Sequence, residues 1–386
     1  MAHENARRSW VGAVAVAALS TLAVGADCVA SAQASPVVNA EAACTPEALP
    51  TFGGPNGSVS WMTTGGLYVG GADTSDHWDD GSPMHTAAYW THDAEGYQIH
   101  ALPNDPLVDD DVLDVNENNR MIDFGYNIAS DRLETWVFDL PTATWTKLPG
   151  LGGFGTRGRR INASGLVTGG SEDRNGIRFP VTWTPPYRSV NKLARNGVFP
   201  YASGNNDLGY SVGTAGRGRS TPAIDKDYQH LGPHQYGLLG VGVVWNPNGT
   251  QTTLPPLFSQ SDLYDIDNSG LVVGASDTPD PNTRHAVAWK NGVISDLGGR
   301  DGWWTVARGL SEGSWAAGGG DDGNTGQAFV WTGAGSLQWL PGLTPGGSSN
   351  GLAVNATLRQ VGGWAHRADG SEPPTVWQCP IGFTTA

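Results

Sequence analysis

The chain has 386 residues, a formal net charge of −15 and only 15% charged residues, with 55 Gly and 16 Trp. The acidic balance argues against nucleic acid or an anionic membrane surface as the main partner. Long runs rich in Ala, Glu, Lys and Leu are absent beyond the N-terminal region, so an all-β chain with many turns fits the composition best.

The N-terminus has the pattern of an export signal. Arg7 and Arg8 precede an apolar run of small residues at 11–26, and an Ala-x-Ala cleavage pattern follows at 32–34. The apolar run is too short and too rich in Ala and Gly for a membrane anchor. We therefore expect a signal peptide over residues 1–34, no membrane insertion, and a secreted, extracellular mature protein.

From residue 58 onward one pattern of roughly 46 residues recurs seven times. Each copy has a strand that ends in an Asx-type turn, as at 267–270, and then an apolar strand that ends at glycine, as at 271–274. A third strand carries a tryptophan, and a fourth runs toward Leu or Leu-Pro. The tryptophans are Trp90, Trp136, Trp183, Trp245, Trp289, Trp331 and Trp377. Their regular spacing predicts one buried indole between each pair of neighbouring sheets.

A repeat of this length that contains only strand and turn signals predicts a β-propeller, here with seven four-stranded blades. Six or eight blades stay open, because repeats one and four are degenerate. Repeat two has Asp123 where others place glycine, which leaves its register open. The domain division is then a closing strand and linker at 35–57 and the seven-repeat propeller at 58–386, together one domain.

The last repeat lacks a fourth strand, because only seven residues follow Cys379. Residues 44–54 resemble the fourth-strand segment 145–153, so we expect the N-terminal segment to complete blade seven. Removal of the signal peptide leaves two cysteines, one near each end of the mature chain. We therefore predict a disulfide between Cys44 and Cys379, which adjacent strands would bring together.

The repeats resemble the extracellular HAF-repeat family. Its strand-three triplet is echoed at 285–289 (His-Ala-Val-Ala-Trp) and at 327–331 (Gln-Ala-Phe-Val-Trp), and its turn and Val-Val-Gly strand at 267–274. Repeat two is also similar to kelch repeats at 134–149. The resemblance covers nearly all of the mature chain. It implies a propeller and an exported protein, and it implies no particular activity.

In a propeller, the connections between strands two and three and between successive blades share one face, and the long polar insertions fall on that face. An acidic group on blades one and two is predicted to gather there. Its members are Asp76, Asp79, Asp80, His85, Asp109, Asp110 and Asp111. Several carboxylates near one point would suit Ca²⁺, although no calcium-loop motif is present. No other cofactor is expected.

A basic group on the same face could oppose the acidic one. Its members are Arg157, Arg159, Arg217, Arg219, Tyr228 and His230, several of them in the long insertion of blade four. Guanidinium groups next to aromatic rings would hold an anionic sugar or an acidic loop of a partner protein.

These features predict a monomeric binding or interaction protein that recognises a glycan or a protein on its long-loop face. No nucleophile elbow, zinc-protease motif or phosphate-binding loop is present, and no catalytic residue can be assigned. The alternative is an extracellular carbohydrate-active hydrolase or lyase that uses a pair among Asp76, Asp79, Asp109 and Asp111 as acid and base.

Overall fold

The computed structural model describes residues 43–195, 198–216 and 240–384, which form strands, turns and loops without a helix. Blade one consists of β2 (Gly53–Met62), β3 (Tyr68–His77), β4 (Pro83–Asp93) and β5 (Gly96–Ala101). Blade two consists of β6 (Val108–Val115), β7 (Arg120–Asn127), β8 (Arg132–Asp139) and β9 (Thr144–Lys147). Blade three consists of β10 (Gly152–Ile161), β11 (Val167–Asp173), β12 (Arg178–Trp183) and β13 (Asn191–Lys192).

The second half of the chain continues the same order. Blade four consists of β14 (Val198–Asn205), β15 (Ser211–Gly216), β16 (Gly240–Trp245) and β17 (Gln251–Thr253). Blade five consists of β18 (Ser261–Ile266), β19 (Leu271–Asp277), β20 (Arg284–Lys290) and β21 (Val293–Gly298). Blade six consists of β22 (Trp304–Leu310), β23 (Ala316–Asp321), β24 (Gly326–Trp331) and β25 (Gln338–Trp339). The last group joins β26 (Ser349–Asn355), β27 (Gln360–Ala365) and β28 (Pro374–Gln378) to β1 (Thr45–Ala48).

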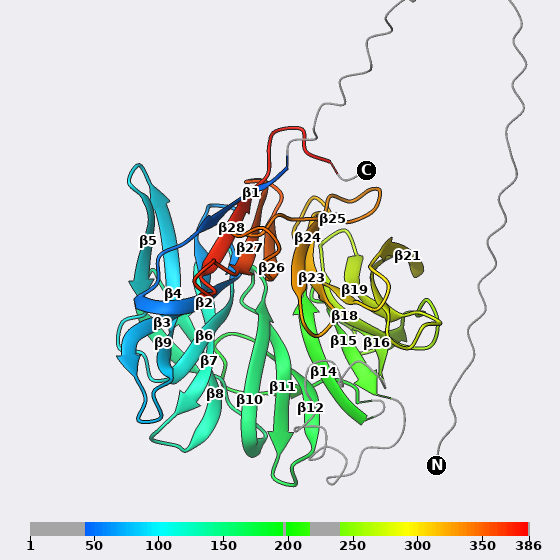
Figure 1. The fold of residues 1–386 in the computed structure, drawn as a ribbon. Coiled ribbons are helices and arrows are strands. Elements are labelled where there is room, and N and C mark those ends of the chain that lie inside the picture. Colours follow the sequence, from blue (N-terminus) through cyan, green and yellow to red (C-terminus); the bar gives the residue numbers. More distant parts are fainter. Residues whose placement is uncertain (1–42, 196–197, 217–239, 385–386) are drawn as a thin grey trace, which may run out of the picture. The chain divides into compact units, whose positions relative to one another are not determined.

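Within residues 40–386 the blades form a ring, because each contacts the next and β26 and β27 of the last contact β2 of the first (Figure 1). The all-β propeller predicted from the repeats is therefore confirmed. The ring closes where β1 pairs antiparallel with β28, with Thr45 opposite Gln378. A disulfide joins Cys44 to Cys379 beside this pairing, across a sequence separation of 335 residues. Both cysteines are buried.

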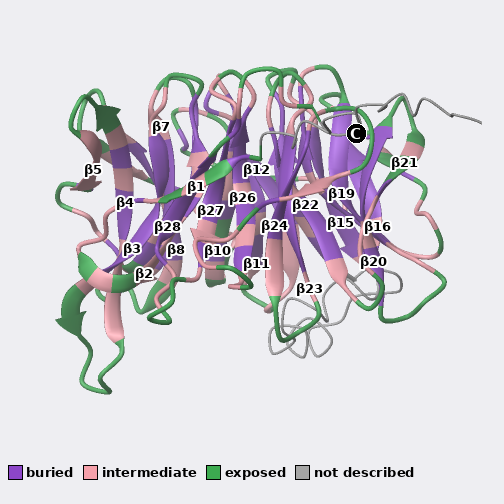
Figure 2. Ribbon diagram, turned by 45° about the horizontal axis from the view of Figure 1, so that its top comes forward, coloured by how far each residue is buried: buried purple, intermediate pink, exposed green. Residues whose placement is uncertain are grey.

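Buried positions follow the middle of the strands, whereas the turns at both ends are exposed (Figure 2). Six of the seven predicted tryptophans are buried in this core: Trp90, Trp183, Trp245, Trp289, Trp331 and Trp377. The prediction for Trp136 is wrong, because this side chain is only half-buried. Phe138, two residues after Trp136, is fully buried and takes the corresponding place in blade two. It pairs with Met121 of the second strand, whereas Trp136 pairs with Asp123.

The recurrent Leu-Pro has a structural role that the sequence did not reveal. Trp183 Nε1 donates to the carbonyl oxygen of Pro149 at 2.8 Å, and Pro149 follows the fourth strand, β9, of the preceding blade. The same bond reaches the preceding blade from five further tryptophans: Trp90 to Pro50, Trp145 to Pro103, Trp245 to Ala194, Trp289 to Pro255 and Trp377 to Pro341. Each indole therefore joins two blades through a hydrogen bond as well as through packing.

The innermost strand of every blade has a β-bulge in one equivalent position. The residue opposite the bulge is glycine in six blades: Gly70, Gly169, Gly213, Gly274, Gly318 and Gly363. In blade two the same position holds Asp123, which pairs with Val112. The pairing of blade two at this bulge therefore matches that of the other blades, and Asp123 is a true substitution for the repeat's glycine.

The Asx turns link blades at the opposite end of the strands. Asn162 Oδ1 accepts from the backbone N–H of Leu166 at 2.9 Å and closes its own turn. Its Nδ2 donates to the carbonyl oxygen of Asn206 in the next blade at 2.8 Å. Asn116 and Asn355 donate in the same way to Asn162 and Thr63.

No helix among the described residues is long and apolar enough to cross a membrane.

Candidate functional site

A cavity of about 450 Å³ lies at the centre of the ring, where the innermost strands meet. Each of the seven bulges places its extra residue in the cavity wall. These residues are Ser60, Leu113, Arg159, Ser203, Tyr264, Arg308 and Leu352. A bulge leaves its extra residue unpaired and re-aims its side chain, which explains why the same strand position faces the cavity in every blade.

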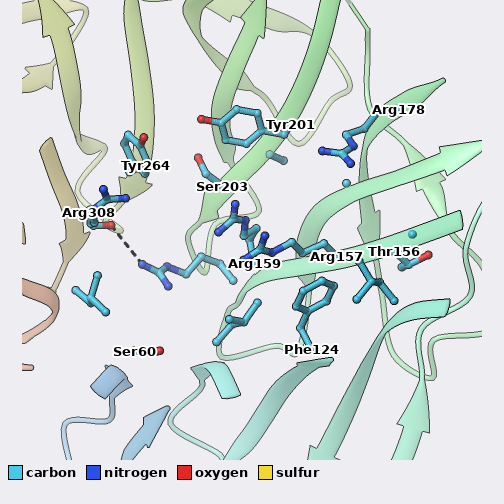
Figure 3. A pocket seen from close by; sticks show the side chains of 17 residues that line it. Ser60, Phe124, Thr156, Arg157, Arg159, Arg178, Tyr201, Ser203, Tyr264 and Arg308 are labelled. Carbon is cyan, nitrogen blue, oxygen red and sulfur yellow. Dashed lines mark hydrogen bonds between the residues drawn. The ribbon is translucent and has the colours of Figure 1, made fainter. Parts of the chain in front are cut away.

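The cavity extends between blades two and three toward the connections of the long-loop face. Here Phe124, Leu133, Arg157 and Arg178 complete its wall. Figure 3 shows the arginine, tyrosine and phenylalanine side chains converging on this space from separate strands. The guanidinium group of Arg157 lies 4.7 Å from the ring centroid of Phe124. The wall is therefore cationic and partly aromatic.

Two of these arginines have no acidic partner in the part of the chain that the structure describes. Arg159 and Arg308 are half-buried, and neither forms an ion pair with a carboxylate among the described residues. Burial lowers the pKa of Arg159, and the positive charges of Arg160 and Arg308 act in the same direction. The guanidinium group of Arg308 lies 5.6 Å from the ring of Tyr264. Uncompensated positive charge in a recessed cavity favours an anion there.

Two further arginines near the cavity form ion pairs with buried carboxylates. Arg160 lies 3.7 Å from Asp265 Oδ2 and stacks 3.9 Å from the ring centroid of Trp61. Burial raises the pKa of Asp265 to about 6, against the opposing effect of Arg160. Arg284 donates to Asp262 Oδ2 at 2.8 Å in a fully buried pair. These carboxylates are engaged and leave Arg159 and Arg308 uncompensated.

The predicted acidic group is only partly brought together. Asp76 is exposed near the end of β3, and Asp79 and Asp80 are exposed on the connection after it. Asp80 accepts a hydrogen bond from the backbone N–H of Ser82. Asp109 is also exposed and has a positive φ of 50°. These four side chains form no joint cluster with other acidic, cysteine or histidine residues in the part of the chain that the structure describes.

His85 joins blades one and two. Its Nδ1 lies 2.8 Å from Asp73 Oδ1, and its Nε2 lies 3.2 Å from Asp111 Oδ1. Burial on its own would lower the pKa of His85, but hydrogen bonding and attraction from Asp111 and then Asp73 raise it to about 9. The imidazole is therefore protonated at neutral pH. It holds two carboxylates together and is a poor general base there.

A second acidic group lies between blades one and two. It consists of Asp105, Asp110 and Asp123, which each contribute one carboxylate oxygen. These three oxygens lie within 4.8 Å of one another, a geometry that could hold a metal ion. Only Asp110 belongs to the residues singled out in the sequence as an acidic site. Asp105 lies within the same acidic stretch, and Asp123 is noticeable in the sequence as a departure from the repeat.

The predicted basic group is divided. Arg157 and Arg159 both line the cavity, whereas Arg217, Arg219, Tyr228 and His230 lie outside the described residues. Sequence reasoning missed Arg308, Tyr201 and Tyr264. A signal for most of the wall exists: each bulge residue stands three positions before the first residue of the Asx-type turn, as Tyr264 does before Asp267.

No family model matches this chain, and no curated protein matches its sequence. Solved structures match its fold. The β-propeller domain of the Trilobed protease from Pyrococcus furiosus is 11% identical, with a TM-score of 0.55 over 83% of this chain and 95% of that one. A puromycin hydrolase mutant is 12% identical, with a TM-score of 0.52 over 83% of this chain and 53% of that one.

The chain is similar to these structures in fold alone, because the identities are far below those that carry function.

Proposed function

We propose that this protein is a secreted binding protein that holds an anionic glycan in its central cavity through the arginine side chains of blades three and six. The observation that carries this proposal is the pair Arg159 and Arg308, two half-buried cations without a carboxylate partner among the described residues. The signal peptide predicted at residues 1–34 and the resemblance to extracellular HAF repeats support the proposed location.

The chemistry of the wall favours a carboxylate- or sulfate-bearing sugar. A guanidinium group presents a planar fork of donors that matches an oxyanion in a bidentate way. Tyr201, Tyr264 and Phe124 provide aromatic surface for the apolar face of a sugar ring. The volume of about 450 Å³ lies within the range of small-ligand pockets. A cavity of this size suits a short oligosaccharide better than it suits the flat surface of a partner protein.

The charge distribution supports the same ligand class. The chain carries a net charge of −15, so anions are repelled from most of its surface. At the centre of the ring, by contrast, the described residues that line the cavity include arginines and no aspartate or glutamate. Binding there should be selective for the anionic group and should weaken as salt concentration rises.

The test is calorimetric titration with short oligogalacturonates, with neutral oligosaccharides of the same length as the comparison. Arg159→Ala and Arg308→Ala should each weaken oligogalacturonate binding by about 10- to 100-fold, because a buried charge-assisted contact is lost. Arg174→Ala is the matched control, since Arg174 is exposed between β11 and β12. Equal binding of the neutral sugars, or unchanged binding by both cavity variants, would contradict the proposal.

The same titration separates the alternatives. Preference for an acidic peptide over the glycan would indicate a protein partner instead. Product formation during the titration would indicate the hydrolase or lyase alternative. A monomer in solution also belongs to the proposal, and light scattering after size-exclusion chromatography measures it.

A further inference from the structure

The carboxylates between blades one and two are unusual in their burial. Asp110 is 1% exposed and Asp123 is 0% exposed, and Asp105 is half-buried above them. They come from three different elements: the connection after β5, the strand β6 and the strand β7. Their nearest oxygens lie within 4.8 Å of one another. Three like charges at this separation repel strongly unless something positive lies among them.

Protein groups satisfy only part of this cluster. Asp110 Oδ1 accepts from the backbone N–H of Ala87 at 3.1 Å, and Asp105 Oδ1 accepts from that of Leu107 at 2.9 Å. The second oxygens of Asp105 and Asp110, and both oxygens of Asp123, accept no hydrogen bond from described groups. No lysine, arginine or histidine among the described residues forms an ion pair with any of the three. A buried carboxylate without a partner is strongly destabilising.

The position of Asp123 is an independent sign that this carboxylate serves a ligand. In the six other blades the equivalent residue is glycine, and a Cβ there would lie 1.9–2.0 Å from a carbonyl oxygen of the innermost strand. Packing therefore disfavours any side chain at this point of the repeat. Blade two nevertheless has one, in the same register opposite Val112, and that side chain is fully buried and unpartnered.

A glycine beside the cluster makes room for it. A Cβ at Gly125 would lie 2.3 Å from the Cβ of Asp110, so the absence of a side chain lets Asp110 lie over β7 beside Asp123. Blade two thus combines an added carboxylate with a vacated neighbouring position. Both changes bring carboxylate oxygens toward one point.

We propose that Asp105, Asp110 and Asp123 bind one divalent cation, best matched by Ca²⁺, which joins the connection from blade one to the inner strands of blade two. The ligands are all hard oxygens, as Ca²⁺ requires. Calcium–oxygen distances of roughly 2.3–2.6 Å allow two ligand oxygens to lie at most roughly 4.6–5.2 Å apart. The three carboxylate oxygens here lie within 4.8 Å of one another, so one ion could reach all of them. The site is distinct from the arginine-lined cavity, and the argument for the cation does not rest on the proposed glycan.

Shared protons are the competing way to neutralise the cluster. Burial, followed by the charge of Asp110, raises the pKa of Asp105 to about 7, and burial also raises the pKa of Asp110 and Asp123. Protons would stabilise the cluster only in acid, whereas a cation would stabilise it at neutral pH and above. Thermal stability measured with and without metal, once below and once above neutral pH, therefore distinguishes shared protons from a bound cation.

The experiment uses the exported protein, stripped with EDTA and titrated with CaCl₂ and then with MgCl₂ by calorimetry and by thermal unfolding. The expected result at about pH 7.5, slightly above neutral, is a single Ca²⁺ site and a rise in Tm. Asp123→Gly restores the residue of the other six blades, so it should fold, and it should lower the affinity for Ca²⁺ by at least about 100-fold. Asp105→Asn provides a second variant that leaves the buried strands unchanged.

Asp79→Asn is the matched control, because Asp79 is an exposed acidic residue of the same face. It should bind Ca²⁺ as the parent does. The proposal is overturned if the stripped parent shows neither heat nor a Tm shift with Ca²⁺ or Mg²⁺. It is equally overturned if folded Asp123→Gly binds Ca²⁺ with unchanged affinity.

Discussion

The indole hydrogen bond between blades can be tested by Trp183→Phe. Trp183 is fully buried, and its Nε1 donates to the Pro149 carbonyl oxygen at 2.8 Å. The substitution removes the donor and leaves that carbonyl oxygen without it, which costs about 1–3 kcal/mol. Phenylalanine also buries about 40 Å² less apolar surface, worth about 1 kcal/mol. The free energy of unfolding should therefore fall by about 2–4 kcal/mol.

Thermal unfolding followed by calorimetry gives the corresponding shift. An unfolding entropy of roughly 2.1 cal/mol/K per residue, over roughly 340 residues, converts this change into a Tm lower by about 3–6 °C. The matched control is Trp136→Phe on the equivalent strand of blade two. Trp136 is half-buried, and its Nε1 donates to Glu134, which also accepts from Ser130 and Lys147.

The control should lower Tm by about 1 °C or less, because Glu134 keeps two other donors and little surface is lost. Equal shifts for the two variants would refute the reasoning, since they would mean that both indoles fill the same structural position. A shift below about 1 °C for Trp183→Phe would refute the interblade bond itself.

Three further changes test other parts of the ring. Cys379→Ser opens the 335-residue interval and should lower the free energy of unfolding by about 4–6 kcal/mol in the chain-entropy model, measured by urea unfolding against the parent with and without reductant. Asn162→Ala removes the bond to Asn206 and the closure of its own turn, and should cost about 1–3 kcal/mol by the same assay. His85 has a pKa raised from 6.5 to about 9, so its contribution to stability is complete below pH 6.5 and is lost as pH rises to about 9. Tm should fall across this range in the parent and stay flatter in His85→Gln, and parallel curves would contradict the assignment.

The periodic features of the fold could be predicted from the sequence. The tryptophan spacing and the Asx turns recur along the chain, so the strands of a degenerate repeat can be assigned by comparison with the other copies. The closing strand was predictable because the last repeat is short by one strand and residues 44–54 supply its pattern.

Trp136 shows where this reasoning fails. Strand β8 carries Trp136 and Phe138 two residues apart, so both side chains lie on one face of the strand and either could fill the core. The pairing of Phe138 with Met121 decides the matter, and pairing is set by the whole blade. The spacing of tryptophans alone could not distinguish the two.

The cavity was missed for a different reason: the fixed offset of its residues from the Asx-type turn has a meaning only once the bulge is known. Alternation along a strand assigns side chains to two faces, and a bulge shifts that assignment by one residue. Arg308 and Tyr264 therefore look like ordinary strand residues, although the bulges direct them into the cavity. The carboxylate cluster has the same difficulty, because its three members meet only through the register of β6 and β7.

The two proposed sites share one strand, and this predicts that they are coupled. Asp123 and Phe124 are neighbours in β7, so their side chains point to opposite faces: one to the carboxylate cluster and one to the cavity beside Arg157. A cation bound to Asp123 would hold β7 in place and thereby order the cavity wall. Ca²⁺ should then tighten the binding of oligogalacturonate, and the glycan should tighten the binding of Ca²⁺ by the same factor, because coupling between two binding sites is reciprocal. Titrating each ligand in the presence and absence of the other measures both factors. Unequal changes in the two affinities would show an error in the measurement. If neither ligand changes the affinity for the other, β7 is rigid without the cation and the sites act independently.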